Sequence, residues 1–122
     1  MGTSTVQLRV SDLAGRNFVD VEATVDTGAT YTLLPADMLE QLQIVPEGTR
    51  RLEVADDRIV EYPIGYARVQ AEGEQSIALV VFGPEGVSPL LGATSLELLS
   101  FAVDPVHRRL VPVDGLLKSA TG

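Results

Sequence analysis

The chain has 122 residues, which is enough for one domain with a buried core and too few for two independent ones. Its 17 acidic and 9 basic side chains give a formal net charge of −8, so charge repulsion disfavours nucleic acid and anionic membranes as partners. The sequence contains no cysteine, which excludes disulfides, thiolate nucleophiles and cysteine-based zinc sites.

Nothing in the chain predicts a membrane span or an export signal. The longest apolar run, residues 77–82, is far shorter than the roughly 20 residues that a membrane-spanning helix requires. The N-terminus lacks a basic segment followed by an apolar one. We therefore expect a cytoplasmic protein with a single domain over residues 1–122, in which residues 114–122 form a weakly ordered tail.

Two alternating segments open the chain. Apolar and polar residues alternate over residues 3–10 and again over residues 18–25, which is the two-residue period of half-buried strands. Residues 11–16 between them are rich in turn formers, so the two segments predict an antiparallel hairpin. The second strand leads directly into Asp26-Thr27-Gly28, which places a carboxylate in a tight glycine turn at a strand end.

A short helix and a second hairpin follow. Residues 31–34 predict a brief strand, and Pro35 can occupy the first turn of a helix over residues 35–42, because the N–H that proline lacks would have no intrahelical partner there. Residues 51–55 and 58–62 predict the two arms of a hairpin. Its charged tip, which we expect to be exposed, is Ala55-Asp56-Asp57-Arg58.

The second half predicts two more strands, a helix and a final pair of strands. Residues 66–70 and the strongly apolar residues 76–82 are joined by a glycine turn, and Pro63 before them suggests an edge or a bulge. Residues 95–99 predict a short helix, for which serine or threonine is a natural N-cap. Residues 101–113 predict a strand, a turn and a strand.

A three-residue pattern occurs twice. Gly28-Ala29-Thr30 recurs as Gly92-Ala93-Thr94, 64 positions later (92 − 28), and a short helix is predicted after each. We interpret the two halves as related strand–turn–helix units around a pseudo-twofold axis. Only the first unit carries an acid, because Asp26 precedes the first pattern and two leucines precede the second.

These motifs, in this order, resemble the retropepsin-like aspartic proteases, specifically their small single-domain bacterial members. The resemblance rests on Asp26-Thr27-Gly28-Ala29-Thr30 after an apolar strand, on the hairpin, and on Leu90-Leu91-Gly92 before a helix. The tip sequence of the hairpin is also similar to the Ala-Asp-Gly-Arg tips of bacterial relatives. The resemblance spans most of the chain and implies a mainly β fold: a closed acid-protease barrel with a flap hairpin and one or two short helices.

The resemblance implies an aspartic endopeptidase that hydrolyses peptide bonds as a homodimer, without cofactor or metal. This chemistry needs two neighbouring carboxyl groups, one ionised to activate water and one protonated to donate to the carbonyl oxygen. The chain supplies one such acid, Asp26. The family pattern implies that Asp26 of a second copy supplies the other across a twofold axis, and that the substrate is a peptide or a protein.

Further residues receive roles from the same resemblance. Thr27 would link the two active-site turns through hydroxyl-to-backbone hydrogen bonds, Gly28 would allow close backbone approach, and Ala29 would pack beneath the cleft. Leu90-Leu91-Gly92 would support the turn from behind. Residues 55–58 would form the tip of a flap that closes over a bound peptide.

Two departures from the retroviral pattern leave a second interpretation open. The hairpin tip lacks the retroviral glycines, and Thr30 stands where retroviral members often have an aspartate. The alternative is a catalytically silent module that keeps the retropepsin fold for dimerisation or peptide binding.

Other chemistries fit the sequence less well. Asp104 and Asp114 are candidates for a second carboxylate within the chain, but both patterns are typical of turns or strand exits. His107, the only histidine, stands beside two arginines and is predicted to be an exposed surface residue. The sequence has no Gly-x-Ser-x-Gly elbow, no phosphate-binding loop and no metal-ligand cluster.

Overall fold

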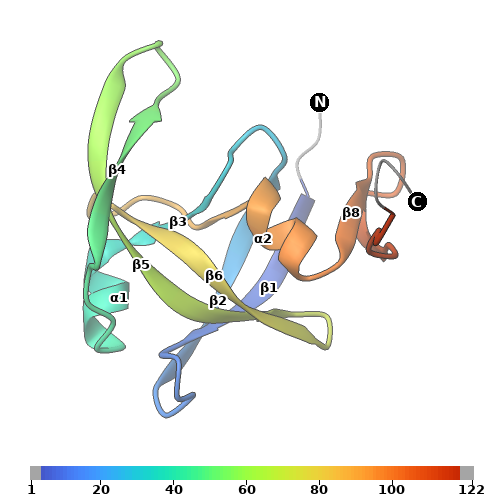
Figure 1. Cartoon of the computed structure of the whole chain (residues 1–122), viewed down its shortest axis with the longest axis horizontal. Coiled ribbons are helices and arrows are strands. Elements are labelled where there is room, and N and C mark those ends of the chain that lie inside the picture. The colour runs from blue at the N-terminus through green and yellow to red at the C-terminus, as the bar shows by residue number, and fades with distance from the viewer. Residues whose placement is uncertain (1–3, 119–122) are drawn as a thin grey trace.

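The computed structural model describes residues 4–118, which form a mainly β structure with two short helices (Figure 1). The strands are β1 (Ser4–Ser11), β2 (Phe18–Asp26), β3 (Thr32–Pro35), β4 (Gly48–Glu53), β5 (Ile59–Ala71), β6 (Glu74–Gly83), β7 (Leu90–Gly92), β8 (Phe101–Asp104) and β9 (Arg109–Pro112). The helices are α1 (Ala36–Gln41) and α2 (Ala93–Leu98). Neighbouring strands follow the order β1-β2-β7-β3-β6-β5-β4, and β5 pairs back onto β1, which closes six strands into a barrel. The predicted closed β-barrel is confirmed.

Apolar side chains from the barrel and from both helices form one core. In β1, Val6, Leu8 and Val10 are buried while the residues between them are exposed, as the alternating pattern predicts. Leu39 of α1 and Leu96 of α2 pack into the same cluster. Burying each of these side chains stabilises the fold by roughly 1.5–3 kcal/mol. Among the described residues, no helix has the length and apolar character needed to cross a membrane.

The β4–β5 hairpin projects from the barrel (Figure 1). β5 pairs with β6 only from Ile64 onward, so residues 59–63 pair with β4 alone. The register between β4 and β5 is unbroken, and Pro63 therefore lies in a two-stranded section rather than at a bulge. The structure confirms the predicted hairpin and the position of its tip.

The two halves of the barrel are related by an offset of 57 residues. Residues 33–42 read Leu-Leu-Pro-Ala-Asp-Met-Leu-Glu-Gln-Leu, and residues 90–99, 57 positions later (90 − 33), read Leu-Leu-Gly-Ala-Thr-Ser-Leu-Glu-Leu-Leu. The first segment contains β3 and α1, and the second contains β7 and α2. Leu33 pairs with Leu90 in antiparallel register, as equivalent residues do when a twofold axis passes between them.

The two Gly-Ala-Thr patterns occupy different structural positions, so the offset of 64 residues predicted from them is wrong. Residues 28–30 form a turn between β2 and β3, whereas residues 92–94 end β7 and begin α2. The longer repeat aligns strand with strand and helix with helix. The pseudo-twofold relation itself holds with the new offset.

The corrected offset shows which residue occupies the place equivalent to Asp26. β2 runs parallel to β7 and pairs Asp26 with Gly92, while β6 runs parallel to β3 and pairs Gly83 with Pro35. Gly92 and Pro35 are equivalent, being 57 positions apart (92 − 35), and so are Gly83 and Asp26 (83 − 26). The second half therefore has Gly83 in the place of the acid. The two leucines before Gly92, which the sequence placed there, lie in β7 and are equivalent to Leu33 and Leu34.

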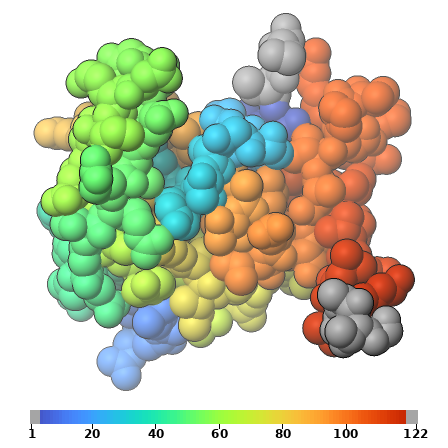
Figure 2. Space-filling model, turned by 45° about the horizontal axis from the view of Figure 1, so that its top comes forward, coloured from blue at the N-terminus to red at the C-terminus, as the bar shows by residue number. Residues whose placement is uncertain are grey.

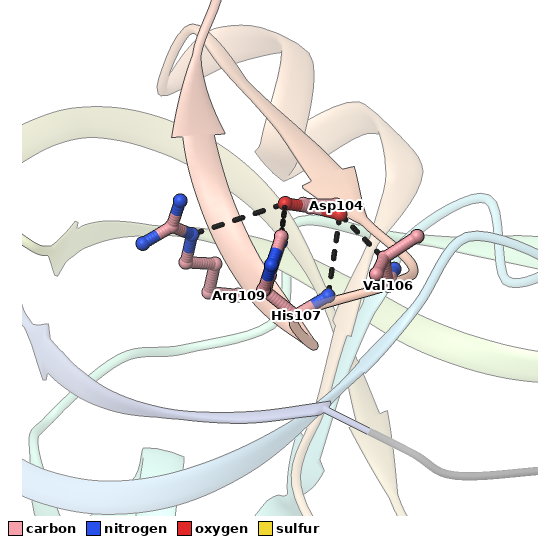
Figure 3. A network of polar contacts seen from close by, with 4 residues as sticks. All are labelled: Asp104, Val106, His107 and Arg109. Atoms are coloured by element: carbon pink, nitrogen blue, oxygen red, sulfur yellow. Dashed lines mark hydrogen bonds and ion pairs between the residues drawn. The ribbon is translucent and has the colours of Figure 1, made fainter.

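β8 and β9 form a separate two-stranded sheet whose turn is held by Asp104 (Figure 3). Its Oδ1 accepts the backbone N–H groups of Val106 at 3.0 Å and His107 at 3.3 Å, and its Oδ2 lies 2.7 Å from Nδ1 of His107. Nε of Arg109 lies 3.9 Å from the same Oδ2. The His107 side chain, the backbone donors and Arg109 hold the pKa of Asp104 below its ordinary value of 3.8. His107 is exposed, as predicted.

After β9 the chain continues without regular structure. The N–H of Val113 donates to the carbonyl of Ser100 at 2.9 Å, which ties the start of this segment to the residue directly before β8. Residues 113–118 are exposed and form neither helix nor strand. The rest of the predicted tail, residues 119–122, lies outside the described residues.

The Asp104 contacts predict a pH-dependent contribution to stability. Between the lowered pKa of Asp104 and its ordinary pKa, the folded protein holds fewer protons at this residue than the unfolded chain does. The Asp104 carboxylate therefore stabilises the fold fully above the ordinary pKa. This stabilisation is lost as the pH falls through the lowered pKa. Asp104→Asn keeps the Oδ1 acceptor and removes the charge. Its free energy of unfolding should lie below that of the unchanged protein at about pH 6, and the two should converge toward about pH 2.

Denaturant unfolding across this range measures the effect, with Asp114→Asn as the matched control at an exposed position. If the difference in the free energy of unfolding between Asp104→Asn and the unchanged protein stayed constant with pH, the proposed contribution of the Asp104 charge would be contradicted.

Candidate active site

Asp26 is the last residue of β2, and its side chain is turned toward the residues that follow it. Oδ1 accepts the N–H of Gly28 at 2.9 Å, and the backbone carbonyl accepts the N–H of Ala29 at 3.2 Å. A Cβ on residue 28 would lie 3.3 Å from that Oδ1, which is tighter than ordinary packing, so glycine suits this turn. The residue is half-buried, and Oδ2 makes no hydrogen bond to another described residue.

The backbone of the turn caps helix α2. The carbonyls of Ala29 and Thr30 accept the N–H groups of Ala93 at 2.8 Å and Thr94 at 2.9 Å. These donors belong to the first turn of α2 and have no partner inside the helix. The predicted serine or threonine N-cap is wrong: the N-cap residue is Gly92, without a side-chain cap, because a turn distant in sequence supplies the acceptors.

Gly92 lies directly behind the turn. It pairs with Asp26 in the parallel register of β2 and β7, and its N–H donates to Oγ1 of Thr32 at 3.1 Å. The same Oγ1 is hydrogen-bonded to Oγ of Ser95 at 2.6 Å, and both of these side chains are fully buried. A Cβ on residue 92 would overlap the carbonyl group of Tyr31, so the position requires glycine.

The structure brings the predicted supporting segment and the predicted turn together. Leu90–Gly92 lies in parallel register beside Thr24–Asp26, with Leu91 fully buried. The side chains of Thr27 and Thr30 are exposed. The Thr27 hydroxyl makes no hydrogen bond within residues 4–118.

The predicted flap tip forms a tight turn of its own. The N–H of Asp57 donates to the carbonyl of Val54 at 2.9 Å, and the N–H of Val54 donates to the carbonyl of Arg58 at 2.9 Å. Asp57 has φ of 66°, the left-handed region that glycine usually fills in such hairpins. Asp56 and Arg58 form an exposed ion pair at 2.7 Å. None of the four tip residues lines the neighbouring cavity.

A cavity of about 400 Å³ lies between the hairpin and the Asp26 turn. Figure 2 shows this face of the molecule, with the hairpin in green beside the turn in cyan. The lining residues come from the turn, the barrel and the hairpin: Gly28, Ala29, Thr30, Tyr31, Leu33, Leu52, Glu53, Val54, Tyr62, Val81 and Leu90. The cavity has both polar and apolar walls and lies within the size range of ligand-binding clefts.

Several lining residues were missed by the sequence predictions. Leu52 and Val54 are two residues apart on β4 and its extension, so they share one face of the hairpin. Tyr62 on β5 pairs directly with Arg50, which belongs to the same alternating set. This period would have identified Leu52, Val54 and Tyr62, but not Glu53, which lies between the first two and also lines the cavity, and no local signal marks Tyr31 as a wall of the cavity.

A second cavity of similar size lies away from the turn. It measures about 460 Å³ and is lined by Arg16, Asn17, Phe18, Val19, Met38, Gln41 and Leu42. This set contains no carboxylate and no residue of the Asp26 turn, so we place the candidate site in the cavity beneath the hairpin. Within residues 4–118, no three His, Asp or Glu side chains come together in a way that could hold a metal ion.

The closed barrel, the aspartate turn backed by a glycine strand and the projecting hairpin define a retropepsin-like aspartic protease fold. The family model described as "gag-polyprotein putative aspartyl protease" matches residues 15–97, which include the turn, the hairpin and β7. The chain belongs to this family.

Comparison with solved structures agrees with this assignment. The chain is similar to the foamy viral protease-reverse transcriptase, whose structure was determined in complex with an RNA/DNA hybrid, with a TM-score of 0.55 and 16% sequence identity over 95% of this chain. It spans 13% of the length of that protein. At this identity the likeness shows the fold alone. None of the curated proteins compared with the chain matches it.

The glycine behind the turn predicts a steric limit. Gly92→Ala would force the backbone of residue 31 away from β7, and we expect a loss of about 2–3 kcal/mol in the free energy of unfolding. Gly115→Ala is the matched control, because a Cβ there meets no atom within 4 Å. Denaturant unfolding measures both, and equal stability of the two variants would contradict the proposed close contact.

Proposed function

We propose that the chain is an aspartic endopeptidase that acts as a homodimer, with Asp26 of each copy as one half of the catalytic pair. The observation that carries the proposal is the setting of Asp26: a half-buried carboxylate oriented by the N–H of Gly28, beside a cleft lined by the residues that follow it. The equivalent position in the other half of the barrel is Gly83. A second copy is therefore the source of the second carboxylate.

The two in-chain alternatives are poorly suited to this role. Both oxygens of Asp104 are engaged by the β8–β9 turn, by His107 and by Val106. Asp114 is exposed, on a segment without regular structure. Neither is held beside the Asp26 turn by a hydrogen bond or a strand pairing among the described residues.

The chemistry follows from two facing carboxyl groups. They share one proton, because two negative charges a few ångströms apart repel each other. The ionised group takes a proton from water as the water oxygen attacks the peptide carbonyl carbon, and the protonated group donates its proton to the carbonyl oxygen. The protonated group of the pair then gives its proton to the nitrogen of the tetrahedral intermediate, while a hydroxyl of the intermediate returns a proton to the ionised group. The C–N bond breaks as the new carboxyl group forms, and one shared proton remains on the pair.

The hairpin and the exposed threonine supply the remaining parts of the proposal. The β4–β5 hairpin covers a bound peptide as a flap and excludes water from the cleft. The exposed Thr27 hydroxyl bonds the turn of the second copy. The left-handed Asp57, where such tips usually have glycine, favours the competing role of a silent peptide-binding module if it hinders closure.

Asp26→Asn tests the proposal, because it removes the ionisable group and keeps its size and its bond to Gly28. We expect kcat/KM on an unbiased peptide library to fall at least about a hundredfold, the minimum that general acid–base catalysis usually contributes. The comparison is made at matched protein concentration from about pH 3 to about pH 8, since the pair must be singly protonated.

Asp37→Asn, at an exposed position on α1, is the matched control and should keep full activity. Equal cleavage by the Asp26→Asn protein and the unchanged protein would contradict the proposed mechanism.

A further inference from the structure

One exposed cation, Arg50, lies beside the cleft next to residues that line it. Arg50 is two residues before Leu52 on β4, so its side chain leaves the strand on the same face as the cavity-lining Leu52 and Val54. It pairs directly with Tyr62, another lining residue, across the two strands. Arg50 therefore leaves β4 on the same face as Leu52, and Arg51 leaves it on the opposite, outer face, although Glu53 on that face also lines the cavity.

Arg50 is held there by a residue of the active-site turn. Its Nη1 donates to the Tyr31 hydroxyl at 2.7 Å, and its guanidinium carbon lies 5.5 Å from the centre of the Tyr31 ring. Tyr31 lines the same cavity. The contact joins the hairpin to the turn and fixes a positive charge between them.

The guanidinium has no acidic partner. Arg9, Arg58 and Arg109 each lie within 4.0 Å of a carboxylate, but Arg50 has no such neighbour among residues 4–118. A guanidinium has five N–H donors in a fork that matches a carboxylate, and only one of those of Arg50 is used, on a neutral phenol. Its remaining donors can bind a carboxylate from a ligand.

We propose that Arg50 and Tyr31 form a carboxylate-binding subsite beside the apolar part of the cleft. The carboxylate is that of an acidic side chain or the C-terminus of a peptide, and the neighbouring apolar walls take an aliphatic side chain of the same peptide. The inference rests on the proposed function in treating the cavity as a peptide-binding cleft. Glu53 also lines the cavity, and its negative charge limits recognition to the immediate reach of Arg50.

Peptide binding to the Asp26→Asn protein tests the subsite without cleavage. The probes are fluorescently labelled octapeptides with an acetylated N-terminus and an amidated C-terminus. Each has a central Leu-Leu pair and alanine elsewhere, except at one position that carries either Glu or its neutral match Gln. This position is moved along the peptide from one pair of probes to the next. Peptides that have a free C-terminal carboxylate and no Glu show whether the bound carboxylate is the C-terminus or an acidic side chain. At one position, or with the free C-terminus, we expect roughly tenfold tighter binding of the acidic peptide than of its neutral match, the size of one charge-assisted hydrogen bond.

Variants locate the effect. Arg50→Gln should abolish the preference for the acidic peptide, and Tyr31→Phe should weaken it. Arg50→Glu should reverse the preference, so that a matched peptide with Lys in place of Glu binds more tightly. Arg51→Gln, on the outer face of the same strand, should leave it unchanged. Glu53→Gln should strengthen binding of the acidic peptide and not of the neutral one.

The outcomes separate this inference from the proposed function. Equal binding of acidic and neutral peptides at every position, a preference that survives Arg50→Gln, or no peptide binding at all would overturn the subsite, whatever the cleavage assay gives. An Arg50-dependent preference in a protein that never cleaves peptides would sustain the subsite and overturn the endopeptidase proposal.

Discussion

The close backbone contact between the Asp26 turn and the start of α2 is the constraint on which the rest of the structure depends. Gly92 lies directly behind the turn, where any side chain would overlap Tyr31, and this proximity lets the turn carbonyls accept the first N–H groups of the helix. The hydroxyls of Thr32 and Ser95 fill the buried space at the crossing and satisfy each other. Among the described residues, no buried side-chain polar atom lacks a partner. The carboxylate of Asp26 is thus held on a rigid base, as positioning for catalysis requires.

The pseudo-twofold relation within the chain gives this base its functional meaning. The two halves share strand pairing and a helix, but they differ at the one position where the first has Asp26 and the second has Gly83. A fold with internal symmetry therefore carries an asymmetric site, with one acid where the proposed chemistry needs two. Exposed Thr27 and the projecting hairpin leave the turn and the cleft open on the sides that a second copy and a peptide would occupy.

The sequence predicts most of the fold and the position of the turn, because alternating strands, glycine turns and the Asp26-Thr27-Gly28 motif are local signals. It misleads where the signal is not local. The exact Gly-Ala-Thr match obscured the looser repeat of residues 33–42 and 90–99, which only strand register identifies as equivalent. The N-cap of α2 could not be predicted from its own residues, because its acceptors come from Ala29 and Thr30. The residues that line the cleft could not be predicted, because the sequence does not show which face of the β4–β5 hairpin turns toward the Asp26 turn.

The central claim is that each chain supplies half of a site. It is tested most directly by adding increasing Asp26→Asn protein to a fixed amount of the unchanged protein, allowing subunits to exchange, and measuring peptide cleavage. Mixed dimers hold one catalytic carboxylate, so activity should fall to about a tenth at tenfold excess of the variant if the two forms pair at random. Asp26→Asn, Gly92→Ala protein, impaired in the turn support, serves as a weaker competitor. Activity that stays constant at every ratio would contradict the account, because a chain with a complete site is indifferent to an inactive copy.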